Sequence, residues 1–314
     1  MRRVGWVIVL AFVAPQGLAA EDWEPARTPW GAPDLNGFWD YGSMTPLERP
    51  EAFADKSHFT PQEAREFVAN FHQFTDGVFK DLEGDSFVGQ DLWLEYGVGI
   101  EPDLRTSLIV DPPNGRLPDM TPGGEAKQAA IGEARMQYRG PEALNTNERC
   151  IVGPTPPLLP SPDNNYMHLF QTPEHVAFLA EFINDARVVP LDGRPHSPAD
   201  LRQWQGDARA HWEGDSLIVE SSRFRDTRAF QSWGANTHLT ERFTIIGPDA
   251  MRYEVTVQDP ETFVSSWTAR KTMHRTDKVV YEYACHEHNY SMQGILGGAR
   301  LKESLAADQT SGEE

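Results

Sequence analysis

The chain is poor in cysteine and in positive charge. Its 314 residues include only two cysteines, which excludes a small domain held together by a dense disulfide network. Lysine and arginine number 28 against 47 aspartate and glutamate residues, a formal net charge of −19. Because phosphate backbones and anionic lipids are bound by surplus positive charge, this balance argues against a nucleic-acid-binding protein and against docking on a charged membrane. A hydrophobic content of 39% excludes wholesale disorder.

Long hydrophobic runs are missing apart from one at the N-terminus. The apolar run Val4–Val13 follows Arg2 and Arg3 and precedes the small residues Gly17–Ala20. This order is typical of a secretory signal peptide, here over residues 1–20. The run is shorter than the roughly 20 residues that cross a bilayer. The sequence therefore predicts a soluble mature protein, periplasmic or secreted, with no membrane span.

The two cysteines, Cys150 and Cys285, lie far apart in the sequence. In an oxidising compartment a pair of cysteines is more often bridged than free, so we expect a Cys150–Cys285 disulfide. A catalytic thiol beside His286 is the alternative, but neighbouring residues on a strand point to opposite faces.

From about residue 161 the chain is rich in aromatic and β-branched residues separated by turn formers. This pattern predicts an antiparallel meander that forms a lipocalin-like barrel or a two-sheet sandwich. No βαβ rhythm is present, which disfavours a parallel nucleotide-binding sheet. Glu213-Gly214-Asp215 and Gly247-Pro248-Asp249 mark hairpin turns. The expected strands are 165–172, 175–182, 186–191, 208–213, 216–224, 237–246, 250–258, 264–274 and 279–287.

The N-terminal part is expected to carry the helices. Residues 21–58, rich in proline and glycine, predict an extended arm. Thr60-Pro61-Gln62-Glu63 predicts the start of a helix that ends near Gly77. A short strand is expected over Thr106–Val110 and a second helix over Glu125–Tyr138. The predicted organisation is a signal peptide at 1–20, an arm and helices packing on the barrel at 21–160, an antiparallel β domain at 161–302 and a disordered tail at 303–314.

Several motifs together resemble a family of uncharacterised secreted bacterial proteins. They are WGAPDLNG at 30–37, PLDGRPH at 190–196, WEGDSL at 212–217, ERFT at 241–244 and YEYACHE at 281–287. The chain departs from the family pattern at His288, where glycine is more frequent. The family has no known activity, so the resemblance implies no functional residues, and the site is predicted from residue chemistry.

Histidines and carboxylates placed on the predicted strands carry the functional prediction. Familiar catalytic motifs, namely GxSxG, the P-loop, GxGxxG and HExxH, are missing. Glu241 falls among apolar neighbours, so it is either paired with an arginine or has the raised pKa that a general acid needs. His196 lies in a turn, and Glu282 and His286 share one face of the last predicted strand. The candidate acid–base residues are His196, His238, Glu241, Glu282 and His286.

Arginine and aromatic side chains are the candidate substrate contacts: Arg194, Trp212, Arg242, Trp267 and Tyr283. Tryptophans spread over the chain, Trp204 among them, could line a flat apolar pocket at the mouth of a barrel. We therefore expect a small-molecule ligand or substrate, apolar or aromatic, as the partner. The sequence leaves the oligomeric state open.

Three functions follow from these residues. The favoured one is a lyase, isomerase or hydrolase that uses His and carboxylate acid–base chemistry without an organic cofactor. The alternative is a non-catalytic lipocalin-like protein that binds a hydrophobic ligand. A metal-dependent enzyme ranks third: His286 and His288 have strand spacing for two imidazole ligands, but no diagnostic third ligand accompanies them.

Overall fold

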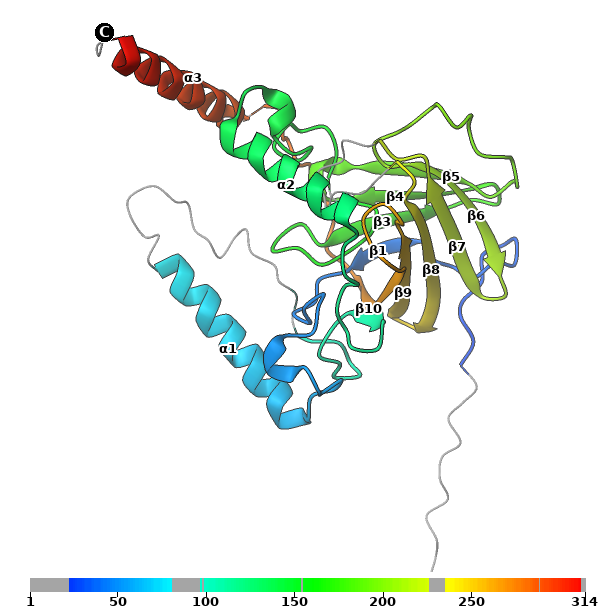
Figure 1. The fold of residues 1–314 in the computed structure, drawn as a ribbon. Coiled ribbons are helices and arrows are strands. Elements are labelled where there is room, and N and C mark those ends of the chain that lie inside the picture. The colour runs from blue at the N-terminus through cyan, green and yellow to red at the C-terminus, as the bar shows by residue number, and fades with distance from the viewer. Residues whose placement is uncertain are drawn as a thin grey trace, which may run out of the picture.

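Figure 1 shows the fold in a computed structural model, which describes residues 23–80, 97, 99–153, 155–225, 235–287 and 289–311. The predicted signal peptide lies outside these residues. The strands are β1 Gly37–Asp40, β2 Ile109–Asp111, β3 Tyr166–Gln171, β4 His175–Ala180, β5 Ala186–Pro190, β6 Asp207–Glu213, β7 Ser216–Ser222, β8 His238–Gly247, β9 Ala250–Gln258 and β10 Trp267–Thr276. The α-helices are α1 Pro61–Lys80, α2 Pro122–Gln137 and α3 Tyr290–Ser311, with short 3-10 helices at Glu51–Phe53, Pro141–Ala143 and Phe182–Asn184.

The strands form one antiparallel sheet that curls toward closure. Its order is β5-β4-β3-β1-β10-β9-β8-β7-β6, with β2 pairing to β10. The two edge strands, β5 and β6, are described in full and approach each other, but they are not paired by backbone hydrogen bonds. The predicted mainly β meander is confirmed. A single curled sheet is the barrel alternative and not the two-sheet sandwich.

Side chains fill the barrel interior at the level of β4 and β8. Alternation along β8 points Leu239, Glu241 and Phe243 inward and leaves His238 and Thr240 exposed, as the sequence pattern predicts. The rings of Phe178 and Phe243 meet across the interior with centroids 5.2 Å apart. Burial of each large apolar side chain stabilises the fold by about 1.5–3 kcal/mol.

Strand β1 overturns one sequence prediction. It inserts between β3 and β10, bringing a piece of the expected N-terminal arm into the sheet. β10 is thereby paired on both sides, to β9 and to β1, so a strand at 279–287 cannot pair with it. Those residues form no strand. Glu282 and His286 therefore do not share a strand face, and that prediction was wrong.

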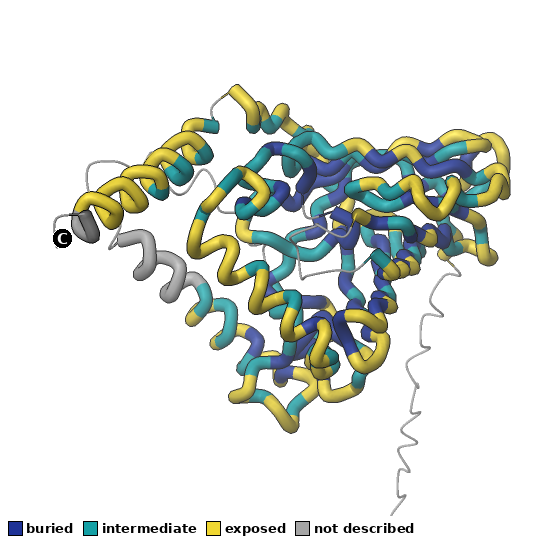
Figure 2. Tube along the Cα trace, turned by 45° about the horizontal axis from the view of Figure 1, so that its top comes forward, coloured by how far each residue is buried: buried dark blue, intermediate teal, exposed yellow. Residues whose placement is uncertain are grey.

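The helices lie outside the barrel. The first begins as predicted, because the backbone N–H of Thr60 donates to Glu63 Oε2 at 2.8 Å and Thr60 Oγ1 accepts from Glu63 N at 3.3 Å. α3 was not expected, and it continues to Ser311 through part of the segment predicted to be a disordered tail. It extends away from the barrel (Figure 1) and is largely exposed (Figure 2). Its Arg300 donates to the backbone oxygens of Tyr138 and Arg139, just after α2. Among the described helices, none combines the length and apolar content that a bilayer crossing requires.

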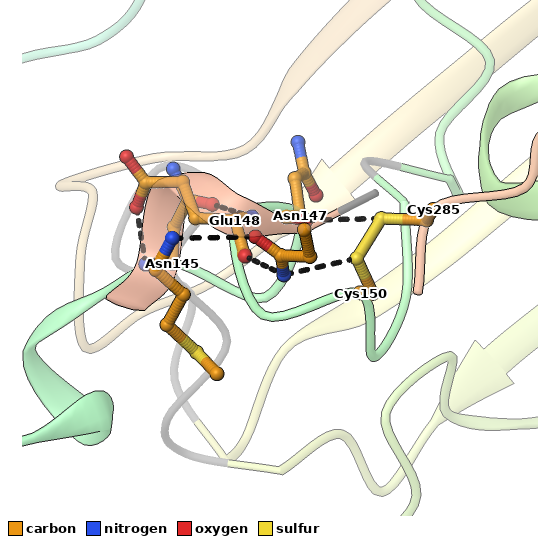
Figure 3. The surroundings of a disulfide bond; sticks show 7 residues. Asn145, Asn147, Glu148, Cys150 and Cys285 are labelled. Atoms are coloured by element: carbon orange, nitrogen blue, oxygen red, sulfur yellow. Dashed lines mark hydrogen bonds between the residues drawn. A yellow bond between two sulfur atoms is a disulfide. The ribbon is translucent and has the colours of Figure 1, made fainter. Parts of the chain in front are cut away.

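The predicted disulfide is present. Cys150 and Cys285 are bonded, with Cα atoms 5.6 Å apart (Figure 3). The turn before Cys150 is fixed by a reciprocal pair, in which Asn145 N donates to Glu148 Oε2 and Glu148 N donates to Asn145 Oδ1, both at 2.8 Å. A bridged pair of cysteines is typical of an oxidising compartment.

Lys271 is a buried lysine in the barrel wall. It lies on the inward face of β10 and is 1% exposed. Its Nζ donates to the backbone oxygen of Tyr41 and lies 4.4 Å from the centre of the Tyr41 ring. Burial lowers the pKa of Lys271 to about 7, although the charges of Glu101 and Asp40 act in the opposite direction.

The depressed pKa of Lys271 makes stability depend on pH. An unfolded lysine has a pKa of about 10.4, so between pH 7 and 10 the unfolded chain binds more protons than the folded one. The free energy of unfolding then rises with pH. We therefore compare the free energy of unfolding of the native chain with that of Lys271→Met. Between pH 7 and 10 the native chain should gain about 1.4 kcal/mol per pH unit relative to this variant. Urea unfolding of both chains at pH 7, 8 and 9 measures it, and a constant difference would contradict the assignment.

Candidate functional site

A groove of about 540 Å³ opens at the seam where β5 and β6 approach without pairing. Its lining is rich in arginine. Arg187 comes from β5, Arg209 from β6, Arg202 from the loop before β6, and Arg225 from the segment after β7. Trp204 adds an aromatic ring to the wall. Asp185 and Asp207 line the same groove.

The four arginines differ in their partners. Arg187 binds Glu241 at 2.6 Å inside the barrel, and Arg209 binds Asp207 at 2.8 Å. Arg202 donates to the backbone oxygens of Phe224 and Ala235, at 3.3 and 2.5 Å. The Arg225 guanidinium stacks over the Trp204 ring, 4.9 Å from its centre. Arg202 and Arg225 thus contact no carboxylate among the described residues.

A second groove, of about 420 Å³, adjoins the seam and shares Arg202 with it. It lies on the outer side of the barrel, along the ends of β7 and β8. His196 and His238 both line it, together with Glu220, Ser222 and Arg223. The structure therefore brings two of the five candidate acid–base residues to one concave surface.

Asp207 holds His196 in one orientation. His196 Nδ1 donates to Asp207 Oδ2 at 2.9 Å, and the same carboxylate accepts from Ser197 N at 2.8 Å and from Arg209 Nη1 at 2.8 Å. Burial alone would raise the pKa of Asp207, but the hydrogen bonds from Ser197, His196 and Arg209 outweigh it and lower that pKa. Asp207 is therefore ionised at neutral pH, and Nε2 of His196 remains as the ring nitrogen that can accept a proton.

Arg223 lies beside this pair in a strained backbone conformation. Its φ is +59°, in the left-handed region that non-glycine residues rarely adopt. Arg223 Nη1 is 3.8 Å from Asp207 Oδ2, and its Nε is buried with no hydrogen-bond partner in the described part of the chain. Strained residues of this kind concentrate at functional sites.

No protein-family model and no curated protein matches the chain. Two solved structures show a distant likeness. One is a secretary abundant heat soluble (SAHS) protein from Ramazzottius varieornatus, with 11% identity and a TM-score of 0.24, covering 50% of this chain and 90% of that chain. The other is a point mutant of the fluorescent protein UnaG, with 14% identity and a TM-score of 0.23, covering 47% and 88%. At these TM-scores neither likeness carries an argument, and the family resemblance of the motifs stays a prediction.

The other candidate acid–base residues lie apart from the two grooves. Glu241 is inside the barrel, where it accepts from Arg187 at 2.6 Å and from the Tyr253 hydroxyl at 3.0 Å. This arrangement is the arginine-paired alternative of the sequence prediction. Glu282 lines a separate cleft of about 780 Å³ beside the disulfide. His286 is exposed in a turn.

The candidate substrate contacts also lie elsewhere. Arg194 is exposed and binds Asp192, with Nε and Oδ1 2.9 Å apart, and Arg242 binds Glu213 at 2.5 Å on the outer face. Trp267 is fully buried, and Trp212 packs against the core. Tyr283 stacks on Phe182 with ring centroids 5.2 Å apart and lines the disulfide cleft. None of these five side chains lines either groove in the described part of the structure. Their role in binding stays a prediction.

The metal prediction gains no geometric support. No group of three His, Cys, Asp or Glu side chains suited to a metal ion occurs within the described ranges. His288, the partner of His286 in the predicted spacing, lies outside them.

Sequence reasoning missed Asp207 and the arginines of the seam. One signal could have found them. No lysine occurs between Lys127 and Lys271, so the basic residues of that stretch, apart from histidine, are all arginines. Six of these arginines fall within 187–225. Arginine is the residue that recognises planar carboxylates and phosphates through two hydrogen bonds at once.

Proposed function

We propose that the protein binds a small organic anion with a flat apolar part in the groove at the β5–β6 seam. The observation that carries this proposal is that Arg202 and Arg225, which contact no carboxylate among the described residues, line one groove of a chain whose net charge is −19. The overall field of such a chain repels anions, so an anion site has to be made by local positive charge.

The residues suggest how such a ligand is held. Arg202 and Arg225 contact no carboxylate among the described residues, so they are the cations to which a ligand carboxylate or phosphate would bind. Trp204 offers an aromatic face, and Val152, Ala186 and Val188 offer apolar surface, to the flat part of the molecule. A hydrophobic ligand in the barrel is less favoured, because Phe178 and Phe243 meet across the interior.

We expect Arg225→Gln to weaken the binding of benzoate by about tenfold or more. A hydrogen bond to a charged group contributes about 1.5–3 kcal/mol, and each 1.4 kcal/mol is a tenfold change in affinity. Isothermal titration with benzoate, phenyl phosphate and the neutral analogue benzamide tests this. Benzoate or phenyl phosphate should bind and benzamide should not, and which of the two anions binds more tightly identifies the anionic group.

The matched control is Arg116→Gln. Arg116 is exposed, contacts no carboxylate among the described residues and lines neither groove, so this variant removes the same charge elsewhere. Its affinity for benzoate should equal that of the native chain. Equal affinity of benzoate and benzamide, or an equal loss in both variants, would refute a specific anion site at the seam.

A further inference from the structure

The second groove, which is lined by His196 and His238 and is called the histidine groove below, contains the groups that a general-base site needs. The ring of His196 is fixed by a buried carboxylate, and the histidine groove shares Arg202 with the proposed anion site at the β5–β6 seam. We propose that this groove hydrolyses esters that carry a free carboxylate, with His196 as the general base. The inference rests on the proposed anion site, which would hold the free carboxylate while the ester lies in the histidine groove.

The orientation of His196 supports a base and not merely a surface histidine. Asp207 is 7% exposed in its side chain, and it binds Nδ1 of a ring that is itself 30% exposed. A buried carboxylate that binds one ring nitrogen fixes the tautomer and stabilises the imidazolium that forms when the other nitrogen takes a proton. Asp207 is in turn held by Ser197 and Arg209, so the pair is preorganised.

The same groove offers positive charge for the oxygen that becomes negative during ester hydrolysis. Arg202 and Arg223 both line it, and the buried Nε of Arg223 has no hydrogen-bond partner in the described part of the chain. A developing oxyanion next to these guanidinium groups would be stabilised more than the neutral carbonyl of the substrate. Arg223 is therefore the residue that we assign to this role.

The step balances with water as the only co-reactant. His196 Nε2 removes a proton from water while the water oxygen forms a bond to the ester carbonyl carbon, and the carbonyl electron pair moves to its oxygen. The intermediate then reforms the carbonyl and breaks the bond to the alcohol oxygen, which takes the proton back from His196. The products are a carboxylic acid and an alcohol. Asp207 does not touch the reacting atoms and acts as a positioning residue.

The substrate probe is the 4-nitrophenyl monoester of glutaric acid, which carries a free carboxylate, and 4-nitrophenyl acetate is its neutral counterpart. We expect saturable release of 4-nitrophenolate from the monoester by the native chain, with a kcat/KM at least tenfold above that for the acetate. His196→Ala should lower kcat by about 10²–10⁴-fold. Free imidazole in the buffer should restore part of the lost rate, a result that a purely structural histidine would not give. Asp207→Asn should lower kcat and leave KM nearly unchanged.

The control is His211→Ala. His211 binds Glu213 at 3.3 Å and is exposed outside both grooves, so this variant removes another histidine paired with a carboxylate and should keep the native rate. Far-UV circular dichroism and Tm of each variant test folding, and His196→Gln replaces His196→Ala should the latter unfold.

The outcomes separate the two proposals. Benzoate binding without hydrolysis of either ester overturns the catalytic inference and leaves the anion site standing. Hydrolysis with equal kcat/KM for both esters, unaltered in Arg225→Gln, overturns the link to the anion site. An unchanged rate in His196→Ala overturns the role of His196. Loss of rate in His196→Ala with rescue by imidazole, together with a raised KM in Arg225→Gln, supports the whole inference.

Discussion

Replacing Cys150 and Cys285 by serine is expected to lower the free energy of unfolding by about 5 kcal/mol. The bridge spans 135 residues of sequence, and the chain-entropy model gives about this value for a closed loop of that size. Small domains are commonly stable by only about 5–15 kcal/mol. The loss should therefore shift the urea midpoint by a large fraction of its native value.

The disulfide also anchors the segment that follows β10, which contains Cys285. Residues 277–287 and 289 have no sheet partner. Tyr283 stacks on Phe182, and the Asn289 side chain donates to the backbone oxygen of Glu148 at 2.8 Å. Without the bridge we expect this segment and α3 to be released first, and limited proteolysis should cut there before it cuts the barrel.

The measurement compares urea unfolding of the native chain, the native chain with dithiothreitol, and the double serine variant. The reduced native chain and the variant should lose the same stability, and the variant should not respond to dithiothreitol. A loss below about 1 kcal/mol would show that the unfolded-state entropy of this loop does not govern stability.

The strands after residue 161 were predictable because local patterns determine them. Alternation along β8 and β9 and the turn residues between strands act over a few positions, and β3 to β10 lie within about three residues of the expected bounds. β1 was not predictable in this way. It has four residues in a stretch rich in proline and glycine, and its partners, β3 and β10, lie far away in the sequence.

α3 was missed for a related reason. Gly294, Gly297 and Gly298 lie within it, and each glycine disfavours a helix by about 1 kcal/mol relative to alanine. Its exposed surface also gives no clear apolar stripe of the kind that identifies a buried helix face. The prediction of a tail followed from these weak local signals.

The site was predictable only in part, because it depends on how the barrel closes. His196 was found as a loop histidine, and the inward position of Glu241 followed from alternation. The partner of each residue did not follow. Asp207 reaches His196 because the loop 191–206 folds back on β6, and Arg187 reaches Glu241 because β5 and β8 face each other across the interior. Contacts of this kind, between a loop and a strand or across the barrel, are not determined by any local sequence pattern.

Replacing Glu241 by alanine is expected to destabilise the fold by about 3–5 kcal/mol, the usual cost of removing one partner of a buried ion pair. The side chains of Arg187 and Glu241 are 8% and 0% exposed, so Arg187 would keep an uncompensated charge. Tyr253 would lose the acceptor of its hydroxyl at 3.0 Å. Burial and the charge of Glu241 raise the pKa of Tyr253 well above its usual value, so this hydroxyl stays protonated and needs an acceptor.

The double variant Arg187→Met/Glu241→Leu separates the cost of an unpaired charge from the worth of the pair. Apolar replacement of both partners is often neutral or stabilising, so we expect it to recover most of the stability that Glu241→Ala loses in urea unfolding. A double variant as unstable as the single one would contradict this account.

Arg187 also lines the groove at the β5–β6 seam. The folded double variant therefore also tests whether Arg187 contributes to binding of the ligand. Because its guanidinium is already neutralised by Glu241, benzoate should bind the double variant nearly as tightly as the native chain, in contrast to the loss expected for Arg225→Gln.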